Sequence, residues 1–407
     1  MIVLTIVIIG AGAAGMAAAL AASENPQAQV VLLERQARVG RKLSATGNGR
    51  CNLSNLRALE GGYHGDEPGF SETAIQTFPP EETLNWFRKM GLFTVAEESG
   101  RVYPYSDQAN SVVDVLRFAL NRPNITLITG FEVAKVKKTP QGFVVEGTEQ
   151  RYVCDKLIIA CGGFAGTKLG GSMSGYKLLR SFGHHVTKLR PALVQIKSDW
   201  NGAASLKGVR CNCRAQIVHS GTVVAESTGE LQWTEYGLSG PVIFEISRDV
   251  CQGAGQWDCR LDLMPDIGRE VLLEELKRRR ETAALAEDLL TGILHNRLGR
   301  VLTQNAGIKN QRSVASLEDW ELERVADTVK CLEVALTEPM GMDSAQVTAG
   351  GIVTAEFEPN SMQSRLVPNL YACGEVLDVD GDCGGYNLQW AWSSGRMAGY
   401  HAAEGKI

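Results

Sequence analysis

Gly10-Ala11-Gly12-Ala13-Ala14-Gly15 follows an apolar run, Ile2 to Ile9, and leads into an alanine-rich stretch. A second apolar run, Val30 to Leu33, then ends at Glu34. This order predicts a strand, a glycine turn, a helix and a second strand, which is the arrangement that binds a dinucleotide. Gly10 allows the tight turn, Gly12 lets backbone approach a pyrophosphate, and Gly15 lets the helix pack on the strand. The phosphates are expected at the helix N-terminus and a ribose hydroxyl at Glu34, and FAD and NAD both remain open.

The segment after Glu34 is rich in basic residues, glycines and small polar residues, and it is too polar to lie in a core. Arg41 and Lys42 are expected to neutralise phosphates. The backbone from Thr46 to Asn52 is expected to approach a flavin ring closely. A surface loop with ordinary glycines is the alternative.

A second glycine-rich region lies more than three hundred residues later. An apolar strand leads into Gly374-Glu375, and the glycine-dense loop 381–385 opens a helix near Asn387. Two helix starts preceded by glycines predict one long cofactor between them, and FAD has that length. The run 156–163 is another strand leading into glycines, but it lacks the spacing of a second fingerprint. We therefore expect no dedicated nicotinamide domain, and we expect NAD(P)H to bind transiently as electron donor.

The chain has 407 residues, which is too long for one compact core. From Pro191 the pattern is typical first of antiparallel strands and then of helices. The strands are expected at 194–197, 213–219, 222–227, 242–246, 257–263 and 329–336, and the helices at 269–276, 285–294 and 317–326. We predict an α/β fold: a split Rossmann-type FAD-binding domain (1–188 and 345–407), an inserted antiparallel β-barrel (189–264 and 328–344) and a small helical insertion (265–327).

The composition is that of an ordinary globular protein, with 44% hydrophobic and 21% charged residues and a net charge of -5. The sequence shows neither a long apolar span nor a signal peptide, which favours the cytoplasm. Its ten cysteines include no C-x-x-C pair, which argues against a dithiol relay. Cys211 and Cys213 form the closest pair, without a second pair or a nearby histidine, so no metal site is expected.

Several of these motifs together resemble the BaiN/RdsA-type bacterial NAD(P)/FAD-dependent flavoproteins. The resemblance covers the whole chain and rests on 10–15, 40–52, 348–351, 374–378 and 384–387. It implies an FAD-dependent oxidoreductase with FAD between the two glycine regions.

The resemblance also implies individual contacts to FAD. It places Gly12, Ala13 and Ala14 at the pyrophosphate, Glu34 at the ribose and Val133 near the adenine. Around the phosphates, ribityl chain or ring it places Arg41, Lys42, Gly47, Gly49, Asn52, Gly374, Glu375, Asp380, Asn387 and Leu388. The predicted cofactor-binding set further includes Gly10, Gly15, Arg35, Thr46, Gly162 and Gly385.

Proteins that this sequence resembles have divergent activities, so several functions stay open. We favour hydride transfer through flavin N5 to an activated C=C bond, with uridine in 23S rRNA as substrate and dihydrouridine as product. The alternatives are a small-molecule oxidase or reductase, acting on an aminoketone or a steroid enone, and a non-catalytic FAD-binding sensor.

Two further predictions concern the RNA partner and the proton donor. Between 289 and 317 the sequence carries four basic residues and no acid, namely Arg297, Arg300, Lys309 and Arg312. These residues are expected either to contact rRNA phosphates or to form a solvated helix face. Cys383 and Tyr386 are the candidate proton donors, since both lie in the loop before the second helix. Cys383 departs from the family pattern, in which this position is often apolar.

Overall fold

The computed structural model describes residues 4–67, 69–251, 253 and 255–404. Ile2 and Val3, which the sequence assigns to the first strand, lie outside this part of the chain. Two compact units are present: Met1–Arg190 with Gln346–Ile407, and Pro191–Ala345. The finer division of the insertion into a barrel and a helical domain at particular residues stays a prediction.

The first unit is built on a five-stranded parallel sheet of order β20-β11-β1-β2-β7. Its strands are β1 (Leu4–Ile9), β2 (Ala28–Glu34), β7 (Ile125–Thr129), β11 (Lys156–Ile159) and β20 (Leu370–Ala372). In β1, Ile6 lies opposite Val30 of β2 on one side and Lys156 of β11 on the other. The strand order reverses at β1, so the carboxyl ends of β1 and β11 mark the switch point where such sheets bind ligands.

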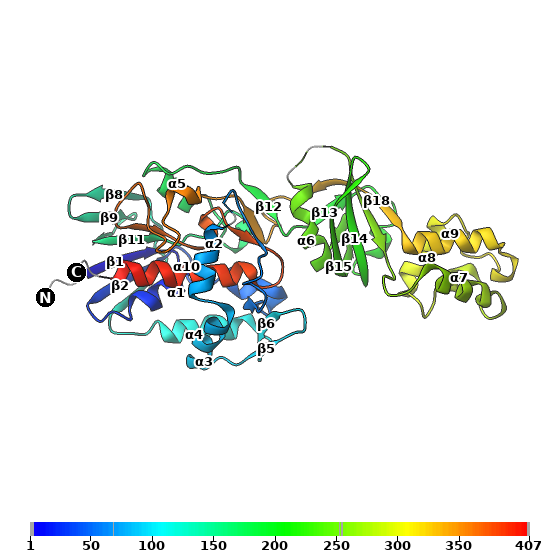
Figure 1. Ribbon diagram of the computed structural model, residues 1–407, viewed down its shortest axis with the longest axis horizontal. Coiled ribbons are helices and arrows are strands. Elements are labelled where there is room, and N and C mark those ends of the chain that lie inside the picture. The colour runs from blue at the N-terminus through cyan, green and yellow to red at the C-terminus, as the bar shows by residue number, and fades with distance from the viewer. Residues whose placement is uncertain (1–3, 68, 252, 254, 405–407) are drawn as a thin grey trace. The chain divides into compact units, whose positions relative to one another are not determined.

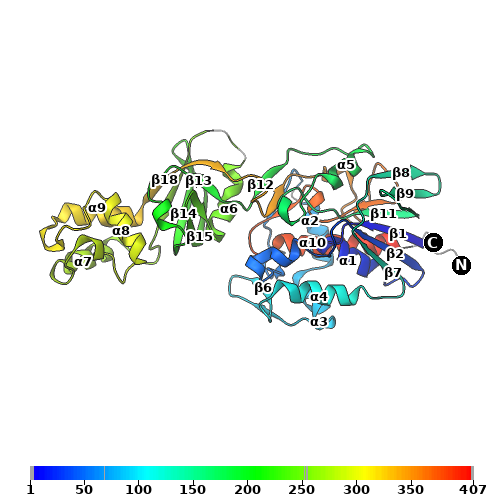
Figure 2. The ribbon, with the colours of Figure 1, turned by 180° about the vertical axis from the view of Figure 1, so that it is seen from behind.

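Two helices from distant parts of the sequence pack together beside this sheet, α1 (Ala13–Ala22) and α10 (Tyr386–Ala403) (Figure 1, Figure 2). A Cβ atom added at Gly395 would lie 2.4 Å from the Ala14 carbonyl oxygen. One added at Gly399 would lie 2.1 Å from the Ala18 carbonyl oxygen. Glycines on α10 and alanines on α1 therefore let the two backbones approach closely.

Smaller elements surround the sheet in the first unit. The helices are α2 (Phe70–Thr77), α3 (Pro80–Lys89), α4 (Ala109–Ala119) and α5 (Ser174–Arg180). One antiparallel sheet contains β3 (Ser54–Asn55), β5 (Thr94–Ala96) and β6 (Arg101–Pro104), and another contains β8 (Lys135–Thr139), β9 (Gly142–Glu146) and β10 (Arg151–Cys154). A short ladder joins β4 (Tyr63–His64) to β21 (Asp380–Gly381).

The second unit contains a closed barrel of order β13-β16-β15-β14-β17-β18. Its strands are β13 (Ile196–Ser198), β14 (Arg210–His219), β15 (Thr222–Thr234), β16 (Gly237–Ser239), β17 (Trp257–Asp262) and β18 (Leu332–Pro339). The helices that the structure describes in this unit are α6 (Pro241–Val250), α7 (Arg269–Arg278), α8 (Asn296–Asn305) and α9 (Asp319–Lys330). The predicted fold class, a Rossmann-type domain with an inserted antiparallel barrel and helices, is confirmed.

Two predictions for the insertion were wrong. The expected strand 242–246 is the helix α6, which begins at Pro241 directly after Gly240 at φ +98°. Proline favours the first helical position, and the buried residues Val242, Ile243 and Ile246 follow a helical repeat. The expected helix 285–294 contains only a short 3-10 turn at Ala286–Asp288, and the helix that follows is α8.

Candidate functional site

The glycine turn between β1 and α1 is shaped by contacts that differ at each glycine. At Gly10, φ is +105° and an added Cβ would lie 2.4 Å from the Ala160 carbonyl oxygen, at the end of β11. At Gly15 it would lie 1.8 Å from the Gly10 carbonyl oxygen. At Gly12 it would meet no atom within 4 Å. Gly10 and Gly15 are thus required by packing, whereas Gly12 borders open space beside the helix start.

The first turn of α1 offers backbone donors toward this space. No side chain of the described residues caps the helix at Gly12, and its first turn carries no acid. The first N–H groups of a helix lack partners within the helix, and its dipole attracts anions there. The segment from Gly12 to Gly15, including Ala13 and Ala14, therefore has the features of a pyrophosphate site.

Glu34 ties the glycine turn to the end of β2, which the sequence did not predict. Its Oε2 accepts a hydrogen bond from the Ala11 backbone N–H at 2.8 Å, and its Oε1 accepts one from the Gln36 N–H at 2.8 Å. A carboxylate oxygen has a second lone pair, so a ribose hydroxyl can still donate to Glu34. The ribose contact stays a prediction, and the support of the turn is an additional role.

The basic residues of the predicted cofactor-binding set already have protein acceptors. Arg35 donates to the Gly170 carbonyl, and Arg41 donates to the Gln36 side chain at 2.9 Å. Lys42 forms an ion pair with Glu375 at 2.7 Å, with 30% and 19% of the two side chains exposed. These contacts fix the basic loop, and a role at the phosphates stays a prediction.

Glu375 is the centre of a polar junction at the carboxyl ends of β11 and β20. Its Oε1 accepts a hydrogen bond from the Thr348 backbone N–H at 2.9 Å, in addition to the Lys42 contact of Oε2. The Thr348 hydroxyl oxygen accepts from the N–H groups of Phe164 and Ala165 at 2.9 and 2.8 Å. The predicted residue Glu375 thus connects three segments at the ligand-binding edge of the sheet.

The two predicted glycine regions meet directly. Gly374 has φ +75°, and an added Cβ there would lie 2.8 Å from the Ala14 side chain at the start of α1. Gly162, after β11, has φ +69° and borders open space as Gly12 does. One ligand that runs along this edge would contact both regions, as the sequence predicts.

The loop 46–52 contains an orphaned polar atom that tests the fit of a flavin. Gly47, Asn48, Gly49 and Cys51 all have positive φ, and Gly49 borders open space. The Asn52 Oδ1 atom is buried and has no hydrogen-bond partner among the residues that the structure describes. An unsatisfied buried acceptor costs about 1–3 kcal/mol. The ring N–H and ribityl hydroxyls of FAD are donors that would satisfy this atom, so the residues present fit the cofactor.

The loop before α10 is held in place by its own residues. Asn387 Oδ1 accepts from the Gly381 N–H at 2.9 Å, and its Nδ2 donates to the Gly381 carbonyl at 2.7 Å. At Gly385, φ is +107° and an added Cβ would lie 2.2 Å from the Ser54 carbonyl oxygen. Asp380 is buried, and Leu388 packs against the core of the first unit. Asn387 therefore shapes the loop, whatever contact it makes to a cofactor.

Val133 follows β7 in a segment that runs beside Glu34. The Phe131 N–H donates to the Glu34 carbonyl at 2.9 Å, and Val133 is half-buried against the core. No strand forms over 131–133. The adenine contact of Val133 stays a prediction.

The two candidate proton donors lie in different surroundings. The Tyr386 ring meets the Tyr63 ring edge-on, with centroids 5.8 Å apart, and the Tyr63 hydroxyl donates to the Tyr386 carbonyl at 3.3 Å. Burial raises the pKa of Tyr63 well above its usual range. Cys383 is half-buried. Their catalytic role stays a prediction.

His64 is a polar residue of this region that the sequence analysis missed. Its Nε2 lies 2.6 Å from Asp382 Oδ1, inside the loop that contains both candidate donors. The density of glycines around it, at positions 61, 62 and 65, was the signal that marked close backbone approach.

Three cysteines near the sheet are unsuited to thiolate chemistry. Burial raises the pKa of Cys51, Cys154 and Cys161 to about 12 each. These side chains stay protonated at neutral pH, and a thiol is a weak nucleophile and metal ligand. No group of three or more potential ligands in the described ranges could hold a metal ion. None of the described helices has both the length and the apolar character to cross a membrane.

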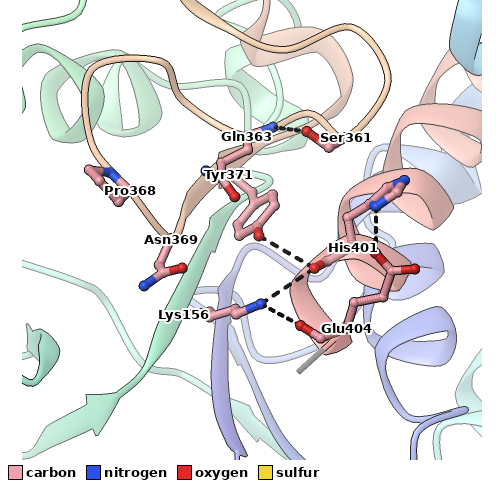
Figure 3. Close-up of a pocket in the computed structure, with 8 residues that line it drawn as sticks. All are labelled: Lys156, Ser361, Gln363, Pro368, Asn369, Tyr371, His401 and Glu404. Carbon is pink, nitrogen blue, oxygen red and sulfur yellow. Dashed lines mark hydrogen bonds and ion pairs between the residues drawn. The ribbon is translucent and has the colours of Figure 1, made fainter. Parts of the chain in front are cut away.

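A hollow of about 400 Å³ lies away from this edge, near the amino ends of β11 and β20 (Figure 3). Lys156 donates to the Glu404 carbonyl at 2.8 Å, and the Tyr371 hydroxyl donates to the His401 carbonyl at 3.4 Å. A lysine at a helix C-terminus satisfies free carbonyls and favours the dipole. Ligands of such sheets bind at the carboxyl ends of the strands, so this hollow is not the cofactor site. Its lysine and tyrosine instead anchor the end of α10.

Ser364, His184 and Glu356 form an array that has the spacing of a hydrolytic triad. The distances are 2.9 Å from Ser364 Oγ to His184 Nε2 and 2.8 Å from His184 Nδ1 to Glu356 Oε2. However, Ser364 is 3% exposed and its oxygen accepts from the N–H groups of Leu366 and Val367. A buried oxygen engaged in this way is no nucleophile, so the array is structural.

Comparison with known proteins identifies the family. Residues 4–401 match the family described as HI0933-like protein Rossmann domain. The chain belongs to this family. It is 39% identical to a 3-dehydro-bile acid delta(4,6)-reductase of Clostridium scindens, with 98% of each chain covered. It is 32% identical to a ribosomal RNA dihydrouridine synthase of Escherichia coli, with 95% of each chain covered.

A solved structure shares the fold at low sequence identity. The 3-ketosteroid delta1-dehydrogenase of Sterolibacterium denitrificans, in complex with 1,4-androstadiene-3,17-dione, has a TM-score of 0.52 at 12% identity. The alignment covers 98% of this chain and 99% of the dehydrogenase. The family member described here is an FAD-dependent oxidoreductase, as the sequence analysis predicted.

Proposed function

We propose that the protein uses NAD(P)H to reduce a carbon–carbon double bond conjugated to a carbonyl group. One observation carries this proposal: two relatives that align over nearly the whole chain are named for such reductions. One name describes reduction of double bonds in a 3-oxo steroid, and the other describes addition of hydrogen to uridine. FAD, when bound, supplies the hydride chemistry that amino-acid side chains lack.

The chain's own residues would hold the cofactor and substrate and deliver a proton. Gly12 to Gly15 supply backbone donors for the pyrophosphate, and Asn52 supplies an unsatisfied acceptor. The loop 381–387 brings protic side chains to the start of α10. Reduction of a C=C bond needs a proton on the carbon that does not receive the hydride, and such side chains can deliver it.

A small molecule that contains a steroid enone is the first candidate substrate, and uridine in 23S rRNA is the second. The steroid reductase is the more similar of the two relatives, at 39% against 32% identity. Three of the four predicted RNA-binding cations also have acceptors within the second unit. Arg312 pairs with the buried Glu321, Arg300 lies 3.6 Å from Glu287, and Arg297 donates to the Lys207 carbonyl. These contacts favour the solvated-face interpretation and weaken the support for RNA.

Single-turnover oxidation tests the proposed function directly. The protein is reduced anaerobically with NADH or NADPH, separated from excess nucleotide, and mixed with a 3-oxo-4,6-diene bile acid or with a 23S rRNA transcript. We expect the bile acid to restore the oxidised flavin spectrum, with a product that has gained two hydrogens by mass spectrometry. Restoration by the transcript alone would establish the RNA substrate. Oxidation only by O2, with peroxide released on adding an aminoketone, would contradict reduction and favour the oxidase.

Changing the basic residues tests the RNA substrate separately. Arg312 stays unchanged, since it supports Glu321 in the capping box of α9. If RNA binds here, Arg297→Ala, Arg300→Ala and Lys309→Ala together should flatten the salt dependence of binding by roughly 0.7 per lost phosphate contact. The control is a variant with Lys89, Arg117 and Lys135 changed to Ala. These residues are exposed, and their substitution removes the same positive charge from the first unit as the triple substitution removes from the second. Equal slopes in wild type and both variants would favour the solvated face.

A further inference from the structure

The segment 61–66 lies against the loop that precedes α10. Its strand β4 pairs antiparallel with β21, with His64 opposite Asp380 and Tyr63 opposite Gly381. The Asp382 N–H donates to the Gly62 carbonyl at 2.9 Å. Two segments that are more than three hundred residues apart in the sequence thus form one backbone ladder.

Glycines make this close contact possible. An added Cβ at Gly62 would lie 2.7 Å from the Tyr386 ring and 2.9 Å from Asp382 Oδ2. One at Gly65 would lie 2.2 Å from the Asp378 carbonyl oxygen. The glycines on both sides of Tyr63 and His64 are therefore required for the position of these two residues.

Within the ladder, His64 and Asp382 form a pair that is both fixed and accessible. His64 Nε2 lies 2.6 Å from Asp382 Oδ1, and 37% and 46% of the two side chains are exposed. Asp382 is held through its own N–H, and its neighbour Gly381 is bonded twice by Asn387. A carboxylate that bonds one ring nitrogen orients the imidazole and selects its tautomer.

The second ring nitrogen of His64, Nδ1, is available to donate a proton. No residue in the described part of the chain makes a hydrogen bond to His64 Nδ1. Imidazole is the side chain whose ordinary titration lies nearest neutral pH, so it can release a proton and regain one from water. Tyr63, on the same strand, is less suited because burial raises its pKa and its hydroxyl bonds the Tyr386 carbonyl.

We propose that His64, oriented by Asp382, donates the proton in the reduction of the C=C bond. This assignment rests on the proposed function. One alkene carbon receives a hydride, whose electron pair originates from NAD(P)H, which leaves as NAD(P)+. The other carbon receives the proton from Nδ1, so the π bond is replaced by two C–H bonds. The imidazolium becomes neutral imidazole, and water returns its proton.

Three variants test the assignment. His64→Gln removes the acid, and Asp382→Asn removes the carboxylate that orients it. His401→Gln is the matched control, because His401 Nδ1 pairs with Glu404 at 2.9 Å on the far end of α10. Circular dichroism and thermal unfolding establish that each variant is folded, and His64→Ala with added imidazole provides a second route if His64→Gln is not.

The first readout needs no cofactor. Histidine ring NMR of the protein without FAD should show His64 as the Nε2–H tautomer when neutral, and Asp382→Asn should change that tautomer population. The His64 signal should be unaffected in His401→Gln. A His64 ring with the same tautomer populations in wild type and Asp382→Asn would overturn the role of Asp382.

The second readout is oxidation of the pre-reduced enzyme by the C=C substrate in a single turnover. His64→Gln should slow this step by about 10² or more and leave reduction by NAD(P)H unchanged. Imidazole should restore part of the rate to His64→Ala, which a purely structural residue would not allow.

The outcomes separate this assignment from the proposed function. If the wild-type enzyme is oxidised by the substrate and His64→Gln matches its rate, the assignment is wrong, and Cys383→Ser and Tyr386→Phe then identify the donor. If no C=C substrate oxidises the reduced wild-type enzyme, the proposed function fails and the assignment fails with it, even where NMR shows the His64–Asp382 pair intact.

Discussion

Replacing Gly15 by alanine is expected to destabilise the protein strongly, whereas replacing Gly12 by alanine is expected to weaken FAD binding without harming the fold. The Cβ at position 15 would lie 1.8 Å from the Gly10 carbonyl oxygen, and it cannot be accommodated unless α1 moves away from β1. Overpacking of this kind costs about 3 kcal/mol or more. At Gly12 the φ of -80° suits alanine, and no atom lies within 4 Å of the added Cβ.

Thermal unfolding of the protein without FAD, together with FAD titration, checks both glycines. Gly12→Ala should unfold like wild type, while its methyl group occupies space predicted for the pyrophosphate. A penalty of about 1–3 kcal/mol there corresponds to a loss of affinity of about ten- to hundredfold. Gly12→Ala that binds FAD as tightly as wild type would show that the pyrophosphate lies elsewhere. Gly15→Ala with wild-type stability would contradict the packing argument.

Replacing Glu34 by alanine is expected to weaken FAD binding and to destabilise the protein without FAD as well. The substitution removes the acceptor of the Ala11 and Gln36 N–H groups, and Ala11 is fully buried. A buried donor left without a partner costs about 1–3 kcal/mol. If Glu34 also accepts a ribose hydroxyl, the lost charge-assisted bond lowers FAD affinity by about ten- to hundredfold.

Two measurements separate the contributions of Glu34. Denaturant unfolding of the protein without FAD reports the support of the turn, and titration of that protein with FAD reports the ribose contact. Glu149→Ala removes an exposed carboxylate of the same unit and should change neither value. A stability loss with unchanged FAD affinity would leave Glu34 with the structural role alone.

The glycine turn could be predicted from the sequence because its determinants are local. The strand, the three glycines, the helix and Glu34 lie within about thirty consecutive residues. Gly10 and Gly15 each have a distinct steric reason, whereas Gly12 borders open space. For a related reason, the sequence predicted only part of the roles of Glu34 and Asn387. The same residue type at the same position can form a hydrogen bond to its own turn or to a ligand, and the sequence does not distinguish the two.

The predictions that were wrong or lost support concern segments whose structure depends on residues outside them. The run 242–246 is rich in β-branched residues, and the preceding Gly240-Pro241 pair, which starts a helix, outweighed that preference. The stretch between 289 and 317 contains no acid, but Glu287 and Glu321 lie just beyond it and meet Arg300 and Arg312. His64 could not be selected, because its partner Asp382 is more than three hundred residues away in sequence.

The packing of α10 on α1 determines when the nucleotide-binding unit can finish folding during synthesis. The ribosome releases β1, α1 and β2 first, yet Ala14 and Ala18 are covered by Gly395 and Gly399, and Ala14 also by Gly374. Each of these contacts spans at least 360 residues, so it forms only after the whole insertion has emerged. The second unit can therefore fold on the ribosome while the nucleotide-binding unit waits for its last strand and helix. Capture of FAD at a finished site therefore has to follow the emergence of α10.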